Sequence, residues 1–141
     1  MLKRVMFVSR TTAENTLGWE DGAIVSITEP EVGQAKLMQG WYAIHRSEFH
    51  DAEPQKTVRD PMVVMTAEHA IEIVDFVHSV APHVNAIVVH CKGGISRSAA
   101  VAKWIAETFS LPFNHSYGSY NKYVYHQLNE ANERRNRRPK A

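Results

Sequence analysis

Hydrophobic residues along the chain follow two patterns: short runs rich in valine and isoleucine, and longer stretches with helical spacing. Short β-branched runs bounded by turn residues are typical of strands. The pattern therefore predicts four strands, over residues 3–9, 23–28, 41–45 and 86–89. The second run is stopped by Glu29-Pro30, and the fourth leads directly into His90.

Three stretches in the second half carry apolar residues at the spacing of one helix face. Thr66 is a candidate N-cap for the first helix, which extends toward Pro82. The second opens at Ser96 and stops near Ser110, and the third runs from about Asn121 into a basic tail at about 134–141. The residues expected to face the core are Ala70, Ile73, Val74, Val77, Ala100, Val101, Trp104, Ile105, Val124, Leu128 and Ala131.

The order of these elements predicts the fold class. Strands that alternate with helices favour a parallel sheet with helices packed on its faces. We therefore expect an α/β fold with a central, mostly parallel sheet of four to five strands. The chain has 141 residues, 44% of them hydrophobic, and shows no linker-like segment or internal repeat. Residues 1–141 are expected to form one domain.

Charge is unevenly distributed although the net charge is only +1. Residues 1–70 carry 7 basic and 10 acidic side chains, whereas residues 71–141 carry 9 basic and 5 acidic ones. A positive half favours an anionic substrate. The terminal run of arginines is interpreted as a solvated helix end, so nucleic acid is not expected as a partner.

A single cysteine, Cys91, excludes a disulfide framework and a cysteine-rich zinc site. The eight histidines are scattered without metal-ligand spacing, so neither a metal nor another cofactor is expected. The first apolar run is too short for a signal peptide, and no segment is long enough to span a membrane. We expect a soluble cytoplasmic protein.

The most informative segment reads VVHCKGGISRSAAV over residues 88–101. It places Cys91 at the end of a predicted strand and six residues before Arg97, with two glycines that permit a tight turn. Such a turn brings together the backbone N–H groups of Lys92, Gly93, Gly94, Ile95, Ser96 and Arg97. Converging donors at a helix N-terminus bind an oxyanion and stabilise a thiolate. The alternative is a buried core thiol beside a solvated arginine.

The spacing H-C-x-x-G-x-S-R-S over residues 90–98 resembles the signature of the protein tyrosine phosphatase superfamily, most closely its small dual-specificity branch. The pattern N-x-x-V-x-x-Q-L over residues 121–128 is similar to the closing helix of that branch. The resemblance covers roughly residues 50–131 and implies a cysteine-phosphatase fold. Asn121 is either a simple helix cap or a contributor to the site.

The resemblance implies a role for each residue of the motif. Cys91 attacks phosphorus, and Arg97 presents a planar fork to two phosphoryl oxygens. Ser98 matches the hydroxyl that stabilises the sulfur when it leaves the phosphoenzyme, and His90 matches the ring that holds the loop backbone. No metal takes part in this chemistry.

Two aspartates compete for the role of general acid, because the W-P-D motif of receptor-like tyrosine phosphatases is absent from the sequence. Asp51 follows the segment Phe49-His50 and lies 40 residues before the cysteine. Asp60 lies 31 residues before it, inside a longer loop. Among related proteins a position at the end of a strand is better preserved than the length of a loop, which varies freely. Asp51 is therefore favoured as the general acid, and Asp60 is the alternative.

The predicted function is hydrolysis of phosphotyrosine, and of phosphoserine or phosphothreonine, in a phosphorylated protein substrate. Lys92 also resembles the loop of phosphoinositide phosphatases, although Ile95 replaces their second lysine. An RNA 5′-phosphatase, a phospho-binding module without turnover and a rhodanese-like sulfur transferase are the alternatives. The sequence leaves the oligomeric state open.

Overall fold

The computed structural model describes residues 1–54 and 62–137 of the chain and contains one sheet. Its strands are β1 (Arg4–Ser9), β2 (Gly22–Thr28), β3 (Ala43–Glu48) and β4 (Ala86–Cys91). They lie in the order β1-β4-β2-β3, and every neighbouring pair is parallel. The predicted α/β class and parallel sheet are therefore confirmed. The third strand was predicted too early, at 41–45.

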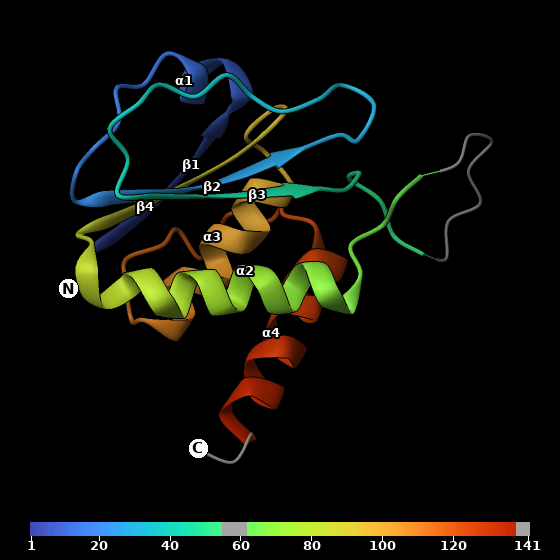
Figure 1. Ribbon diagram of the computed structural model, residues 1–141. Helices are drawn as coiled ribbons and strands as arrows, with labels where there is room; N and C mark the ends of the chain where they lie inside the picture. Colours follow the sequence, from blue (N-terminus) through green and yellow to red (C-terminus); the bar gives the residue numbers. More distant parts are fainter. Residues whose placement is uncertain (55–61, 138–141) are drawn as a thin grey trace.

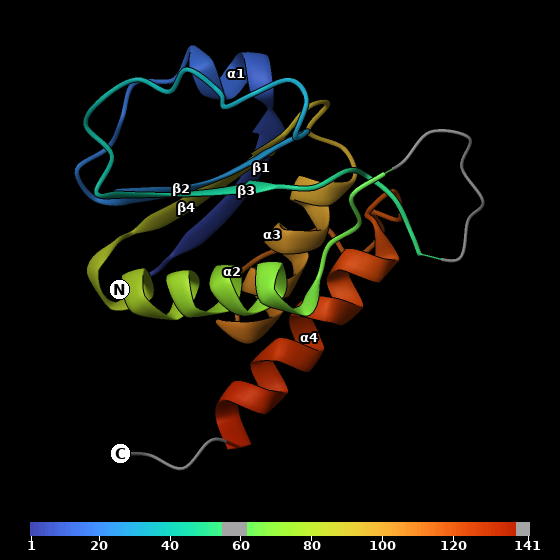
Figure 2. The same cartoon turned by 45° about the vertical axis from the view of Figure 1, so that its right-hand side comes forward.

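Helices cover the sheet unequally on its two faces. On one face lie α2 (Ala67–Val80), α3 (Arg97–Thr108) and α4 (Lys122–Arg137), while α1 (Arg10–Glu14) and the chain between β2 and β3 cross the other (Figures 1 and 2). The three long helices were predicted from their apolar spacing. The five-residue α1 and the 3₁₀ turn Ala81–His83 were not, because elements this short carry no measurable periodicity.

Side chains on successive strand positions point to opposite faces of the sheet, which separates two apolar clusters. The larger cluster lies under the long helices and includes Val25 and Ile27 of β2 and Trp104 of α3. The smaller lies on the other face, around Ile24 of β2, and is covered by Trp41. Both faces of β2 are buried, so apolar residues occupy consecutive positions of the strand from Ala23 to Val25 rather than alternate ones.

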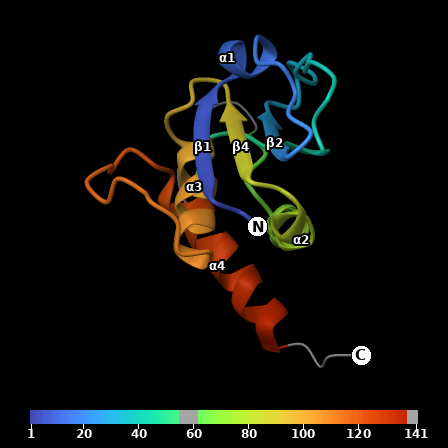
Figure 3. The same cartoon turned by 90° about the vertical axis from the view of Figure 1, so that its left-hand side faces the viewer.

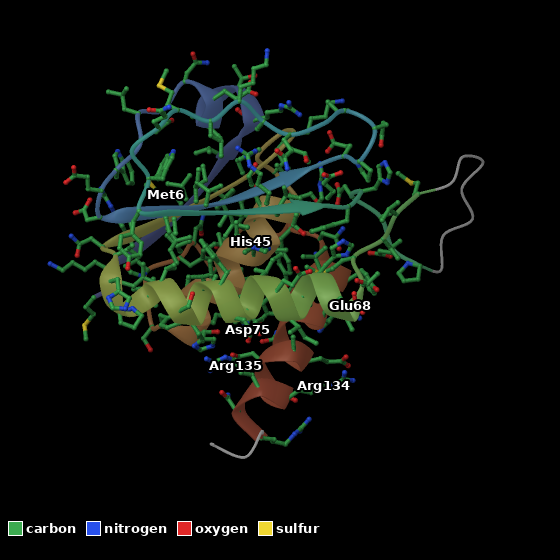
Figure 4. The ribbon with its side chains drawn as sticks, in the orientation of Figure 1. Met6, His45, Glu68, Asp75, Arg134 and Arg135 are labelled. Atoms are coloured by element: carbon green, nitrogen blue, oxygen red, sulfur yellow. The ribbon has the colours of Figure 1, made fainter. Side chains whose placement is uncertain are left out.

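Two polar contacts join α2 and α4 beside the buried apolar face of α4. Arg135 Nε forms an ion pair with Asp75 Oδ1 at 3.3 Å, and Figure 4 shows the two side chains facing each other across the gap between the helices. His78 Nε2 lies 2.7 Å from Asn132 Oδ1. The basic tail was predicted to be a solvated helix end, and through Arg137 it is the last turn of α4, with Arg134 and Arg137 exposed and only Arg135 of these three in an ion pair among the described residues.

The parallel arrangement brings the carboxyl ends of all four strands to one edge of the sheet, as β1 and β4 show in Figure 3. This edge is where open α/β sheets bind ligands. The segments that follow Ser9, Thr28, Glu48 and Cys91 therefore meet there. Within residues 1–54 and 62–137, no helix combines the length and the apolar character needed to cross a bilayer.

Candidate active site

A tight loop joins β4 to α3, from the end of the strand at Cys91 to the start of the helix at Arg97. Gly94 adopts φ 68° in this loop. A Cβ at this position would lie 2.5 Å from the backbone of Val8 and Ser9, so the loop can approach the end of β1 only with glycine here. The 92–96 loop is thus seated on the carboxyl edge of the sheet.

Hydrogen bonds from outside orient the peptide groups of the 92–96 loop. Three of its carbonyls accept such bonds: Lys92 O from Arg10 N–H (3.2 Å), Ser96 O from Asn121 N–H (3.1 Å) and Ile95 O from the Tyr117 hydroxyl (2.5 Å). In a trans peptide the C=O and the following N–H point in opposite directions. The N–H groups of Gly93, Ser96 and Arg97 are therefore turned inward, as a binding site for an oxyanion requires.

The Cys91 thiol lies at the base of this loop and is buried. Its Sγ is 3.2 Å from Ser98 Oγ. Burial raises the pKa of the thiol, but hydrogen bonds from the hydroxyl and amide of Ser98, the charge of Arg97 and the amide of Gly94 together lower it below its usual value. The local fields favour a thiolate, which is the nucleophilic form of cysteine.

Thiol alkylation measures this effect directly. Because the pKa of Cys91 is lowered in the folded protein, iodoacetamide reactivity should rise and level off at lower pH than for an unperturbed cysteine. Ser98→Ala removes the hydroxyl and should move the inflection upward by about one pH unit. The exposed Ser119→Ala is the matched control and should leave the profile unchanged. If the pH profile of Ser98→Ala is the same as that of the parent, the assigned hydrogen bond between Ser98 and Cys91 is contradicted.

Arg97 is buried, and two hydrogen bonds hold its guanidinium group in place. Its Nη1 donates to Phe49 O at 2.7 Å, and its Nη2 donates to Glu29 Oε2 at 2.5 Å. Its Nε is also buried and has no hydrogen-bond partner within the described parts of the chain. The guanidinium carries more N–H donors than these two contacts use, so it retains donors for an anion.

His90, the last residue before the cysteine, links the loop to the middle of the sheet. Its Nε2 lies 2.6 Å from Ser26 Oγ in β2, and its Nδ1 lies 3.4 Å from Cys91 O. Burial lowers the pKa of the ring, although the contact with Cys91 opposes this shift. A neutral imidazole suits its position between a hydroxyl and a carbonyl.

Asp51 lies beside the loop, three residues beyond the end of β3. Its Oδ1 accepts a hydrogen bond from Ser96 Oγ (2.8 Å) and one from Asn121 Nδ2 (2.7 Å). Asn121 also caps α4, because its Oδ1 accepts the Val124 N–H at 3.0 Å. Asn121 is therefore a helix cap that also contacts Asp51. Asp60, the competing acid, lies outside the described residues.

Sequence analysis missed three residues that contact the site or its flanking segments: Glu29, Tyr117 and His50. Glu29 directly follows β2 and pairs with Arg97; the carboxyl end of a strand was the signal that could have identified it. His50 pairs with Val63 through its backbone N–H (2.7 Å to the carbonyl) and its Nδ1 (2.8 Å from the amide N). Its Nε2 lies 2.9 Å from Glu31, so His50 ties the segment before Asp51 to two neighbouring segments.

The rim of the loop is open to solvent. Lys92 and Gly93 are exposed, and the Ile95 side chain is 56% exposed although it is apolar. A cavity of about 260 Å³ opens next to Asp51 and Ser96 and is also lined by Tyr120 and Lys122. Across residues 1–54 and 62–137, no three potential ligands of the His, Cys, Asp or Glu type gather at metal-binding distance.

Comparison with solved structures shows the same fold in a distant protein. A crystal structure of human tyrosine phosphatase-like serine/threonine/tyrosine-interacting protein superposes with a TM-score of 0.59 at 16% identity. The match covers 93% of this chain and 92% of that one. No family model matches the chain, and no curated protein matches its sequence. The fold expected from the resemblance to tyrosine phosphatases is therefore confirmed.

Proposed function

We propose that this chain is a cysteine-dependent phosphatase that hydrolyses phosphotyrosine, and phosphoserine or phosphothreonine, in protein substrates. One observation carries the proposal: the Cys91 thiol, whose pKa is lowered by the amides of Gly94 and Ser98 and by the charge of Arg97, lies at the base of the 92–96 loop, and the buried Nε of Arg97 has no hydrogen-bond partner in the described parts of the chain. A nucleophile and an oxyanion site thus share one position. This arrangement suits in-line attack on a phosphate monoester.

In the first step the Cys91 thiolate attacks phosphorus, and the bond from phosphorus to the ester oxygen breaks. Arg97 and the loop amides hold the three non-bridging oxygens and balance their charge in the transition state. A protonated Asp51 gives its proton to the departing oxygen, which leaves as an alcohol or phenol. The product is a cysteinyl-phosphate.

In the second step water attacks phosphorus, and the sulfur–phosphorus bond breaks. Asp51, now a carboxylate, accepts a proton from the water, so that inorganic phosphate is released. Ser98 donates a hydrogen bond to the sulfur as it recovers its negative charge, consistent with their 3.2 Å separation. The cycle consumes no cofactor. A thiolate without a second cysteine in the chain suits a reducing, cytoplasmic setting.

The role of Asp51 depends on the leaving group. Asp51→Asn should lower turnover of phenyl phosphate or phosphotyrosine by about 10²-fold, the lower end of general acid catalysis. Nitrophenyl phosphate should be affected far less, because its leaving oxygen hardly needs a proton. The alkaline limb of the pH–rate profile should flatten in the same variant. Steady-state kinetics with the two substrates test both expectations.

Asp60→Asn is the matched comparison for that experiment. The contact between Asp51 and Ser96 supports Asp51 as the acid, so Asp60→Asn is expected to behave like the parent. If Asp60→Asn instead produces the larger loss on phenyl phosphate together with the flattened limb, the two roles are exchanged.

A substrate panel tests the proposed function itself. Phosphotyrosine, phosphoserine and phosphothreonine peptides, phosphoinositides and 5′-phosphorylated RNA are assayed at one enzyme concentration, with and without EDTA. We expect phosphotyrosine peptides to rank first and EDTA to have no effect. A lipid or an RNA ranked first would change the substrate class while preserving the chemistry. Cyanide consumption with thiosulfate, without phosphate release, would identify a sulfur transferase.

A phospho-binding module without turnover is the second candidate. The observation in its favour is the structural neighbour, which is described as phosphatase-like and as an interacting protein. Intact Cys91 and Arg97 argue for turnover in this chain. Multiple turnovers on nitrophenyl phosphate support the enzyme; tight phosphopeptide binding without phosphate release supports the module.

A further inference from the structure

Tyr117, in the segment between α3 and α4, contacts the 92–96 loop from outside. Its hydroxyl donates to Ile95 O at 2.5 Å. Its ring is half-buried and meets Phe7 of β1 edge-on, with 5.2 Å between the ring centroids. Phe113 of the same segment packs on Phe7 as well, at 6.0 Å. The hydroxyl is therefore presented to the loop from a ring fixed against the sheet.

The segment that carries Tyr117 is itself anchored to α3. Lys103 Nζ pairs with Glu107 at 3.2 Å. The same ammonium lies over the aromatic rings of Phe113, Tyr120 and Tyr125, 5.3–5.7 Å from their centroids. Cation–π contacts of this kind hold a segment in place even without regular secondary structure.

The contact with Ile95 acts on a single peptide group. The Ile95 carbonyl and the Ser96 N–H belong to the same plane and point in opposite directions. A donor on the carbonyl therefore fixes that N–H toward the interior of the loop and polarises it. The other outward carbonyls, of Lys92 and Ser96, receive backbone donors, whereas the Ile95 carbonyl receives its donor from a side chain.

The surroundings of Tyr117, including the nucleophile, raise the pKa of its hydroxyl. Burial raises the pKa of its hydroxyl, and the charge of Cys91 raises it further. The phenol therefore stays protonated, and remains a donor, throughout the pH range in which Cys91 ionises. The other ionisable groups in or beside the loop include Cys91, Lys92, Arg97, His90 and Asp51.

We infer that Tyr117 is a positioning residue that locks the Ile95–Ser96 peptide in the orientation that binds an oxyanion. It touches neither the substrate nor the sulfur; it acts through the loop. This role rests on the proposed function of the 92–96 loop as a phosphate site. It assigns to the α3–α4 segment a part in phosphate binding that the sequence motif does not contain.

Tyr117→Phe tests the inference because it keeps the ring against Phe7 and removes only the hydroxyl. Orthovanadate affinity should fall by roughly 3- to 10-fold, the loss of one hydrogen bond. The inflection of Cys91 alkylation by iodoacetamide should move to higher pH. Tyr42→Phe is the matched control: Tyr42 lies before β3, at the opposite edge of the sheet, and should change neither reading.

The outcomes separate this inference from the proposed function, because vanadate binding and alkylation need no turnover. A folded Tyr117→Phe, with parental thermal unfolding, that binds vanadate and is alkylated like the parent overturns the role of Tyr117. Weaker vanadate binding and a higher alkylation inflection that appear equally in Tyr42→Phe also overturn it. If the parent binds vanadate but hydrolyses no substrate, the proposed phosphatase function is overturned. A selective effect of Tyr117→Phe on vanadate binding and alkylation would still establish that Tyr117 positions the loop.

Discussion

Cys91→Ser is expected to lower the rate of nitrophenyl phosphate hydrolysis by about 10⁴-fold or more, the scale of loss when a catalytic nucleophile is removed. A serine hydroxyl at this position is a much weaker nucleophile, because the fields that ionise a thiol are far too small to ionise an alcohol. The 92–96 loop keeps its amides in this variant. Vanadate or phosphopeptide binding should therefore persist.

Thermal unfolding is the control for Cys91→Ser. The Cys91 side chain is buried and contacts Ser98, and serine has nearly the same shape, so the fold should be retained. Retention of more than about 1% of the parental rate by a folded variant would contradict covalent catalysis through Cys91, because removal of a catalytic nucleophile lowers the rate by orders of magnitude.

Arg97→Lys is expected to lower turnover by about 10³-fold or more, because an arginine that holds a transferring phosphoryl group contributes about 10³–10⁵-fold. One ammonium cannot present a planar fork to two oxygens. It also cannot keep both anchors of the native side chain, Phe49 O and Glu29. Vanadate binding should weaken along with the rate.

Arg46→Lys is the matched control for this experiment. Arg46 also donates to a backbone carbonyl, Ala35 O at 2.9 Å, but it lies in β3 and its hydrogen bond runs to the chain between β2 and β3. Its replacement should leave turnover near the parental level. If Arg97→Lys binds vanadate as tightly as the parent does, the guanidinium does not face the bound anion and its proposed role is wrong.

Much of the fold follows from local patterns in the sequence. The strands around Val25 and Val88 are buried on both faces, and α2 has both a cap at Thr66 and an apolar face, so their signals are strong. The bounds predicted for the third strand, 41–45, were wrong because of tertiary packing. Trp41 looks strand-forming by propensity, but it packs on the small cluster before β3 begins.

The candidate site divides in the same way. Residues of the motif were predictable because they resemble a family signature and lie within one short segment that joins β4 to α3. Asp51 was placed by a topological argument, its position after a strand. Glu29 and Tyr117 reach the loop from distant segments. The place of Glu29 at the carboxyl end of β2 is visible in the sequence, but its contact with Arg97 and that of Tyr117 with Ile95 depend on the strand order and on packing around β1, which no local pattern encodes.

The cysteinyl-phosphate is the central claim, and its detection is the most direct test. The parent and Asp51→Asn are mixed with excess nitrophenyl phosphate, quenched by denaturation within the first turnovers, and digested for peptide mass spectrometry. We predict a phosphoryl group on the peptide that contains Cys91, more abundant in Asp51→Asn because water attack is slower, and absent from Cys91→Ser. Phosphate release by the parent with no modified peptide, or with the phosphoryl group on another residue, would contradict the mechanism.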